Sequence, residues 1–81
     1  MNILELTSFL IKSVVTDPDM VSIKQIAEDD EYVTIEVLVD SEAIGSVIGR
    51  QGAIVNAIRT IVQASAYANN LKKVKINVDS F

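Results

Sequence analysis

The first twenty residues carry apolar side chains at the spacing of an amphipathic helix. Four of these positions define one helical stripe: Ile3, Leu6, Leu10 and Val14. Asn2 and Glu5 lie three residues apart, which is the spacing of a capping box with asparagine in place of serine or threonine. The helix should stop within residues 16–19, because a proline at position 18 disfavours helical backbone at the residue before it.

Alternation of apolar and polar residues then predicts two strands. Val21 and Ile23 begin the first alternation, which becomes irregular at residues 25–26, where we expect a β-bulge. Residues 28–31 are all acidic and should form the turn. Residues 33–39 have valine or isoleucine at each odd position, alternating with Thr34, Glu36 and Leu38, so this strand should have one buried face and one face mostly exposed to solvent.

The second half of the chain predicts two helices and a strand. Asp40 or Ser41 can cap a short helix from Ala43 to Val47. A longer helix runs from about residue 52 to 67, with asparagines at 69–70 ending it, and a last strand covers residues 73–78. The two helices form a crossover between the second and third strands, which favours parallel pairing of these strands, whereas the first two strands form a hairpin. We therefore expect one α+β domain over residues 1–81, in the order α-β-β-α-α-β, with a three-stranded mixed sheet covered on one face by helices.

Charge is divided unevenly along the chain. The net charge is −4, but residues 1–42 carry ten acids and two bases, whereas residues 43–78 carry five bases and no acid. A protein with this division can present a local cationic face to a polyanion. The alternative is chance clustering in a short chain. The acidic run at 28–31 is expected to be solvated instead of binding a metal.

Composition narrows the function classes. The chain has no cysteine and no histidine, and it contains no P-loop and no apolar run long enough to cross a membrane. We expect a cytoplasmic protein that is not an enzyme and needs no cofactor or metal. The aromatic residues number only two tyrosines and two phenylalanines, so base stacking on aromatic rings should not be the main mode of binding.

The segment between the two internal helices is the strongest functional signal. Gly49 and Gly52 let the backbone turn sharply and approach another molecule closely. Gly52 opens the longer helix, whose free N–H groups favour a phosphate, and Arg50 at the tip adds a cation. Apolar residues on both sides, such as Ile48 and Val55, would form the wall of a groove.

This segment resembles the signature of KH domains, and the element order is that of the type II KH fold. The match runs from Ile48 to Val55 around G-x-x-G, and the resemblance covers essentially the whole chain. A chain of this length is similar to the small bacterial KH-domain RNA-binding protein A family. That resemblance implies an RNA chaperone that acts with a larger KH-domain RNA-binding partner in cell elongation and peptidoglycan homeostasis. Relatives often have Gly-Arg-Lys-Gly, whereas this chain has Gln51, so one charge is missing from the loop.

The candidate single-stranded RNA contacts follow from the loop and its flanks: Ile48, Gly49, Arg50, Gln51, Gly52, Val55 and Arg59. Ile48 and Val55 can equally serve the core, and Arg59 can simply lie on the exposed side of its helix. The lysines at positions 72, 73 and 75 either extend a phosphate track or cover an edge strand.

The longer helix also has an apolar stripe that is either a wide core contact or a dimer face: Ile54, Ile58 and Ile61. Two functions therefore compete. One is single-stranded RNA binding with low sequence specificity, by a homodimer or beside a larger KH-domain partner. The other is a protein-interaction module that recruits another RNA-binding protein and itself binds RNA only weakly.

Overall fold

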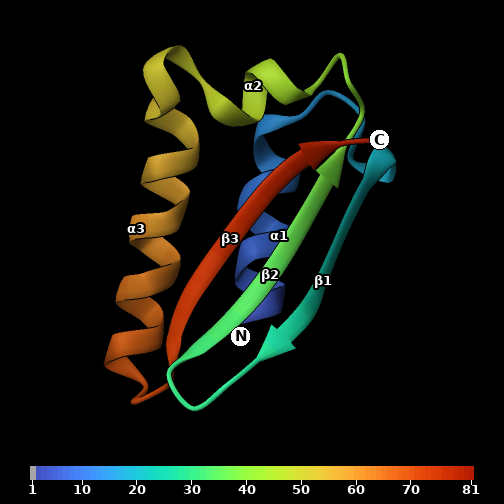
Figure 1. The fold of residues 1–81 in the computed structure, drawn as a ribbon. Coiled ribbons are helices and arrows are strands. Elements are labelled where there is room, and N and C mark those ends of the chain that lie inside the picture. The colour runs from blue at the N-terminus through green and yellow to red at the C-terminus, as the bar shows by residue number, and fades with distance from the viewer. Residues whose placement is uncertain (1) are drawn as a thin grey trace.

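The structure is a computed structural model that describes residues 2–81, and it has the predicted order of elements (Figure 1). The helices and strands are α1 (Ile3–Val14), β1 (Val21–Glu28), β2 (Tyr32–Val39), α2 (Ile44–Ile48), α3 (Ala53–Ala68) and β3 (Lys73–Ser80). Two short 3₁₀ turns join them: η1 (Pro18–Met20) before β1, and η2 (Arg50–Gly52) between α2 and α3. The α-β-β-α-α-β order expected for the type II KH fold is confirmed.

The capping box at the start of α1 is present as predicted. The Glu5 backbone N–H donates to Asn2 Oδ1 at 2.7 Å, and the Asn2 N–H donates to Glu5 Oε1 at 3.3 Å. These bonds satisfy two of the donors that a helix leaves free at its first turn. The helix ends at Val14, ahead of the proline, and it buries Ile11 and Thr7, whose hydroxyl donates to the Ile3 carbonyl.

The three strands form one mixed sheet with β2 in the centre. β1 pairs with β2 antiparallel, and the register shifts between Gln25 and Ala27, which confirms the predicted bulge. β2 pairs with β3 in parallel over eight residues, from Tyr32 opposite Lys73 to Val39 opposite Ser80. In Figure 1, α1 lies behind the sheet and α3 runs beside the β3 edge, so the front face of the sheet carries no helix.

The core lies between the helices and the rear face of the sheet. Its fully or almost fully buried members come from every helix and from β2 and β3: Ile11, Ile35, Val37, Val39, Val47, Ile58, Val62 and Ile76. The alternation of β2 buries Ile35, Val37 and Val39 in this core, and Val33 at the start of the strand is partly buried against it. No helix within residues 2–81 has both the length and the apolar composition to cross a membrane.

Two local predictions need correction. The N-cap residue of α2 is Ala43, which lies directly before the helix, and no side chain caps the helix, so neither Asp40 nor Ser41 does so. Asp40 instead accepts the Ala43 N–H through its backbone carbonyl at 2.8 Å, closing a turn that leads into the helix. The second correction concerns β3, which continues to Ser80 because its last residues still pair with the end of β2.

Candidate nucleic-acid interface

The glycine loop joins α2 to α3 through backbone conformations that most residues avoid. Gly49 has φ 75° and ψ 177°, and Gly52 has φ 78° and ψ 12°. Gln51 between them has φ 56° and ψ 28°, in the left-handed helical region. The Gly49 N–H donates to the Gly45 carbonyl at 2.9 Å, and the Gly52 N–H donates to the Gly49 carbonyl at 3.2 Å. The loop is therefore a defined turn held by its own backbone.

Close packing adds a second reason for glycine at position 49. A Cβ atom there would lie 2.4 Å from Ile54 Cγ1 and 2.8 Å from the Ile54 backbone nitrogen. Both distances are shorter than a Cβ atom adopts to a non-bonded heavy atom. At Gly52 the nearest atom to such a Cβ would be Asn56 Nδ2 at 3.3 Å, the end of a flexible side chain. Gly49 thus brings the loop against the first turn of α3, whereas Gly52 chiefly supplies the left-handed start of that helix.

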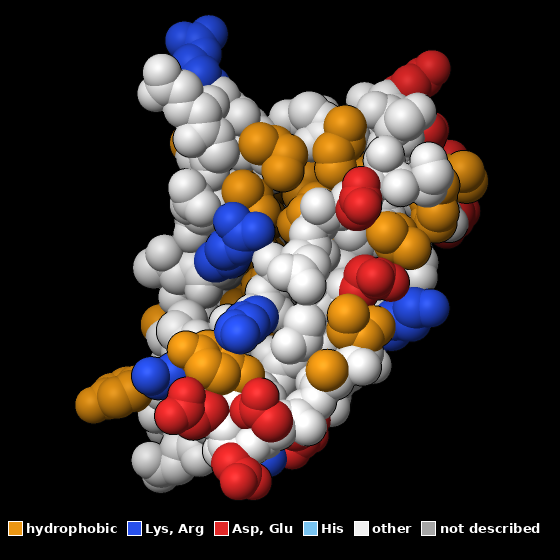
Figure 2. All heavy atoms as spheres, viewed as in Figure 1, with side chains coloured by type: hydrophobic (Ala, Val, Ile, Leu, Met, Phe, Trp, Pro, Cys, Tyr) orange, Lys and Arg blue, Asp and Glu red, His pale blue; other side chains and the backbone are white. Residues whose placement is uncertain are grey.

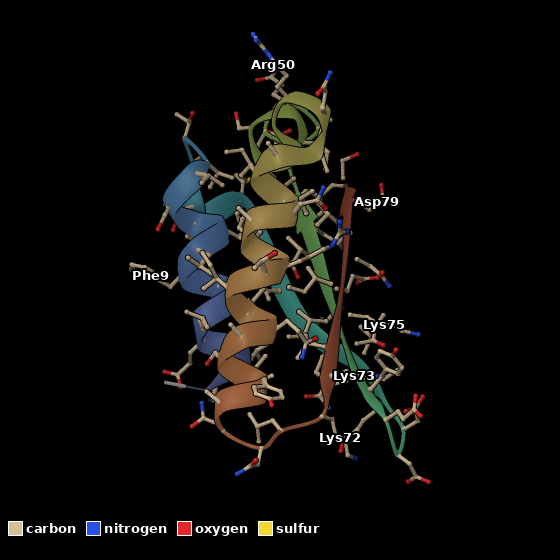
Figure 3. All side chains as sticks on the ribbon, turned by 90° about the vertical axis from the view of Figure 1, so that its left-hand side faces the viewer. Phe9, Arg50, Lys72, Lys73, Lys75 and Asp79 are labelled. Carbon is tan, nitrogen blue, oxygen red and sulfur yellow. The ribbon has the colours of Figure 1, made fainter. Side chains whose placement is uncertain are left out.

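The two middle residues of the loop are exposed at one end of the molecule. Arg50 projects from that end, away from the sheet (Figure 3), and Gln51 beside it is also exposed. The first turn of α3 follows at once; its first N–H, from Ala53, donates to the Arg50 carbonyl, and the helix dipole has its positive end here. The geometry combines a cation, an amide and a helix N-terminus, and each of these attracts a phosphate.

A groove lies between the middle and C-terminal part of α3 and the exposed edge of β3, and no residue of the glycine loop lines it. Its lining comes from α3, from β3, from the loop between them and from the start of β2: Tyr32, Arg59, Thr60, Gln63, Ala64, Tyr67, Leu71, Lys73, Val74, Lys75, Ile76 and Asn77. Three of these residues are basic. None of the lining residues, all within the described part of the chain, is acidic.

Two side chains of α3 bond to the backbone of the β3 edge. Arg59 donates from Nη2 to the Ile76 carbonyl at 2.9 Å and from Nε to the same oxygen at 3.3 Å. Gln63 Oε1 accepts the Val74 N–H at 2.9 Å. Residues two apart on a strand point their backbone groups to the same side. Val78 therefore turns its backbone groups to the same edge of β3, beyond the residues that line the groove.

The remaining candidates differ in burial. Ile48 is half-buried, but Val55 is only 3% exposed and lies in the protein interior. Ile58 is 4% exposed and belongs to the core cluster, so its assignment to a dimer face is wrong for this fold. Ile54 and Ile61 are 37% and 48% exposed, so part of the predicted stripe does reach the surface.

The three lysines around the start of β3 make different contacts. Lys72 Nζ lies 2.6 Å from Glu28 Oε2 in the β1–β2 hairpin, and this contact lowers the pKa of Glu28. Lys73 and Lys75 instead project over the front face of the sheet (Figure 3). Their Nζ atoms lie 5.8 Å and 4.2 Å from the centre of the Tyr32 ring.

The predicted cationic face is therefore divided. Arg50 lies at the loop end, Arg59 lies in the groove, and two lysines lie towards its far end. Sequence patterns did not single out Tyr32. The feature that identifies Tyr32 is its place opposite Lys73 in the parallel pairing of β2 with β3. That place is known only once the register of the two strands is known.

Residues 5–78 match the family model described as KhpA/KhpB, KH domain. The chain belongs to this family. It is 39% identical to the RNA-binding protein KhpA of Clostridium perfringens over 74 residues, which are 91% of this chain and 96% of that protein. It is 36% identical to the RNA-binding protein KhpA of Streptococcus pneumoniae serotype 4 over 70 residues, which are 86% of this chain and 85% of that protein. These relatives are named for RNA binding and not for a reaction.

Solved structures show the same fold in a larger protein. An Era variant from Aquifex aeolicus, bound to GDP and AlF₄⁻, superposes with a TM-score of 0.70 at 15% identity. Era in complex with MgGDPNP and a segment of 16S ribosomal RNA superposes with a TM-score of 0.68 at 16% identity. Each match covers 98% of this chain but 30% of the Era chain. At such low identity the likeness establishes the KH-type fold alone.

Within residues 2–81, no three acidic side chains converge in a way that could hold a metal ion.

Proposed function

We propose that this protein binds single-stranded RNA in the groove between α3 and β3, with the glycine loop gripping the sugar-phosphate backbone. The observation that carries this proposal is the loop itself. Two glycines with positive φ present exposed Arg50 and Gln51 directly before the N-terminus of a 16-residue helix. The KhpA relatives are named as RNA-binding proteins, which supports the same ligand.

Low sequence specificity follows from the groups that the groove offers. Of the polar groups that line the groove, Arg59 already bonds to the Ile76 carbonyl and to Asn56 Oδ1, and Gln63 to the Val74 N–H, so few are free to read base edges. Phosphate contacts at the loop position the RNA without reading its sequence. The expected ligand is an unpaired segment, since a KH domain clamps about four nucleotides at its G-x-x-G loop.

The test is binding of a labelled single-stranded RNA at two salt concentrations to the wild type and to the double variant Arg50→Asp/Gln51→Asp. Both glycines and the core remain, and aspartate tolerates the left-handed backbone of position 51. We expect salt-sensitive binding by the wild type, and at least a tenfold loss in the variant. A matched control is Lys12→Asp/Ser13→Asp on α1, which changes the net charge equally at two other exposed positions. Equal losses in both variants would show that overall charge, and not the loop, governs binding.

We also propose a homodimer or a heterodimer with a larger KH-domain protein through the outer side of α3. Ile61 is 48% exposed and Ile54 is 37% exposed, and seven residues place them on the same side of the helix. Ile61→Asp should shift a dimer to monomer in sedimentation equilibrium. Ile26→Asp is the matched control, because Ile26 on β1 is also 48% exposed. If Ile61→Asp remains a dimer, the proposal that this side of α3 forms the dimer interface is wrong.

We further propose, from the family resemblance, that the protein is a cytoplasmic, non-catalytic RNA chaperone linked to cell elongation and peptidoglycan homeostasis. A low-specificity groove suits a chaperone, because transient binding to many unpaired segments favours refolding of RNA. The direct test is strand annealing of two complementary labelled RNAs, with and without the protein. No acceleration at a protein concentration that saturates the RNA would contradict the chaperone role.

A further inference from the structure

The end of the groove remote from the glycine loop opens onto the front face of the sheet. There the ring of Tyr32, the first residue of β2, lies opposite Lys73 in the parallel register. Lys75 Nζ lies 4.2 Å from the centre of the Tyr32 ring, and Lys73 Nζ lies 5.8 Å from it. All three residues line the groove. We call this group of Tyr32, Lys73 and Lys75 the Tyr32 platform.

We propose that the Tyr32 platform is a second nucleotide-binding site, at which an RNA base stacks on the tyrosine ring while the two lysines bind the adjoining phosphates. This inference rests on the proposed function, because it concerns RNA that continues beyond the segment clamped at the glycine loop. It extends the path of the RNA from the groove onto the front face of the sheet, which no helix covers (Figure 1).

Both lysines are available for phosphate. Within residues 2–81 the one salt bridge joins Lys72 to Glu28, so neither Lys73 nor Lys75 is held by a carboxylate. The lysines are exposed and the Tyr32 ring beneath them is half-buried, so a base must displace the lysines to reach it. A cation–π interaction near the surface is weaker than the stacking of a base on an aromatic ring. A bound nucleotide can therefore replace the lysines over the ring. Each displaced lysine then gains a phosphate in place of the ring.

The acidic hairpin limits the direction of the RNA but does not block the platform. Asp29 Oδ1 accepts the backbone N–H groups of Glu31 and Tyr32, both at 2.8 Å, and these bonds lower the pKa of Asp29. Glu28 is occupied by Lys72. Glu28 is thus neutralised by Lys72, whereas Asp29, Asp30 and Glu31 keep their negative charge and repel phosphate below the platform. Figure 2 shows this acidic group at the lower end of the sheet, so RNA should cross over β3 and not over the hairpin.

A simple structural role for the same contacts makes a different prediction. If Tyr32 and the lysines only shield the edge of the sheet, their loss should change stability and leave RNA affinity unchanged at every RNA length. If they bind a nucleotide, the effect should depend on RNA length. An oligonucleotide of about four residues fills the clamp at the loop, whereas one of about eight residues can also reach the platform.

The experiment compares oligoadenylates of these two lengths by NMR titration, which also measures weak binding. Tyr32→Ala should weaken binding of the longer RNA about five- to hundredfold, the loss expected for one stacked base. Tyr32→Phe should retain most of that affinity, because the ring remains. Neither variant should change the affinity of the shorter RNA more than about twofold. Equal losses at both lengths, or no loss in folded Tyr32→Ala, would overturn the proposal.

The lysines are tested by the variant Lys73→Gln/Lys75→Gln. For the longer RNA, the slope of log affinity against log salt should fall by about 1.4, from two phosphate contacts on a single strand. Lys24→Gln is the control, since Lys24 lies on β1 opposite Glu36 and outside the groove. An unchanged slope in the double variant, or an equal change in the control, would exclude the two lysines as phosphate ligands.

Tyrosine fluorescence gives an independent measurement. The chain has two tyrosines and no tryptophan, so Tyr67→Phe leaves Tyr32 as the one tyrosine that emits. The longer RNA should quench this emission and the shorter RNA should not. Absence of quenching by a bound longer RNA would contradict stacking. Failure of the wild type to bind either RNA would instead contradict the proposed function, so the two failures are distinguishable.

Discussion

Among glycine-to-alanine substitutions in the loop, Gly49→Ala should lower the free energy of unfolding the most. The φ of 75° and ψ of 177° at Gly49 lie in a region that is essentially restricted to glycine, and a side chain held there costs about 1–3 kcal/mol. The added Cβ would also lie 2.4 Å from Ile54 Cγ1 and 2.8 Å from the Ile54 nitrogen. The side chain can move, but the backbone nitrogen is fixed in the first turn of α3. Overpacking of this kind costs roughly a further 1–3 kcal/mol, for a total of about 2–6 kcal/mol.

The assay is urea unfolding followed by circular dichroism, with the free energy of unfolding extrapolated to water. Gly45→Ala is the matched control, because no heavy atom lies within 4 Å of the Cβ position and the residue is inside α2. That substitution should stabilise the protein by about 0.5–1 kcal/mol, since alanine favours helix over glycine. A free energy for Gly49→Ala within about 0.5 kcal/mol of the wild type would refute the reasoning. It would mean that the loop relaxes to another backbone path.

Three further substitutions test separate contacts. Arg59→Met removes both bonds to the Ile76 carbonyl and should lower the free energy of unfolding by about 1 kcal/mol in the same assay. Lys72→Met should raise the pKa of Glu28, read from its carboxyl resonance, because Lys72 is the main cause of the lowered value. A lowered pKa stabilises the fold above the ordinary carboxyl range and loses that effect as pH falls through the folded value. Wild type and Lys72→Met should therefore differ in stability at neutral pH and converge in acid; a constant difference would contradict the pairing. Gln51→Lys should strengthen RNA binding and steepen its salt dependence by about 0.7 if the loop meets a phosphate, whereas an unchanged slope would argue against that contact.

Most of the fold could be predicted because the chain is strictly patterned where it is buried. Valine or isoleucine at every odd position from 33 to 39 identifies the central strand, and all but the first of these are buried. The capping box and the bulge have local sequence signals that tertiary contacts did not override. The ends of elements were harder. β3 continues through Asp79 and Ser80 because the end of β2 is there to pair with, and a single segment does not show the length of its neighbour.

The candidate site divides in the same way. The glycine loop needs positive φ at positions 49 and 52, and glycine adopts that conformation readily, so two glycines at this spacing predict the loop from the sequence. The error at Ile58 arises because Ile54 and Ile58 lie only about 40° apart around the helix. The direction in which α3 faces the sheet decides which of the two is covered. Contacts between distant segments had no local signal: Lys72 meets Glu28 across 44 positions, and Tyr32 meets the lysines only through the strand register.

The position of the acids explains how a chain of net charge −4 can attract RNA. The groove is lined by three basic residues, Arg59, Lys73 and Lys75, and by no acid among the residues that the structure describes there. Asp79 lies four residues from Lys75 along β3, about 13 Å at the rise of a strand. Glu36 lies opposite Lys24 of β1 in the strand register, on the side of β2 away from β3. Salt at physiological strength screens exposed charges beyond about 8 Å, so a phosphate in the groove responds chiefly to the bases that line it, except at the Tyr32 end, where the acids of the hairpin also repel it. The net charge acts only at greater distance, where it slows the approach of RNA without weakening the contacts made after arrival.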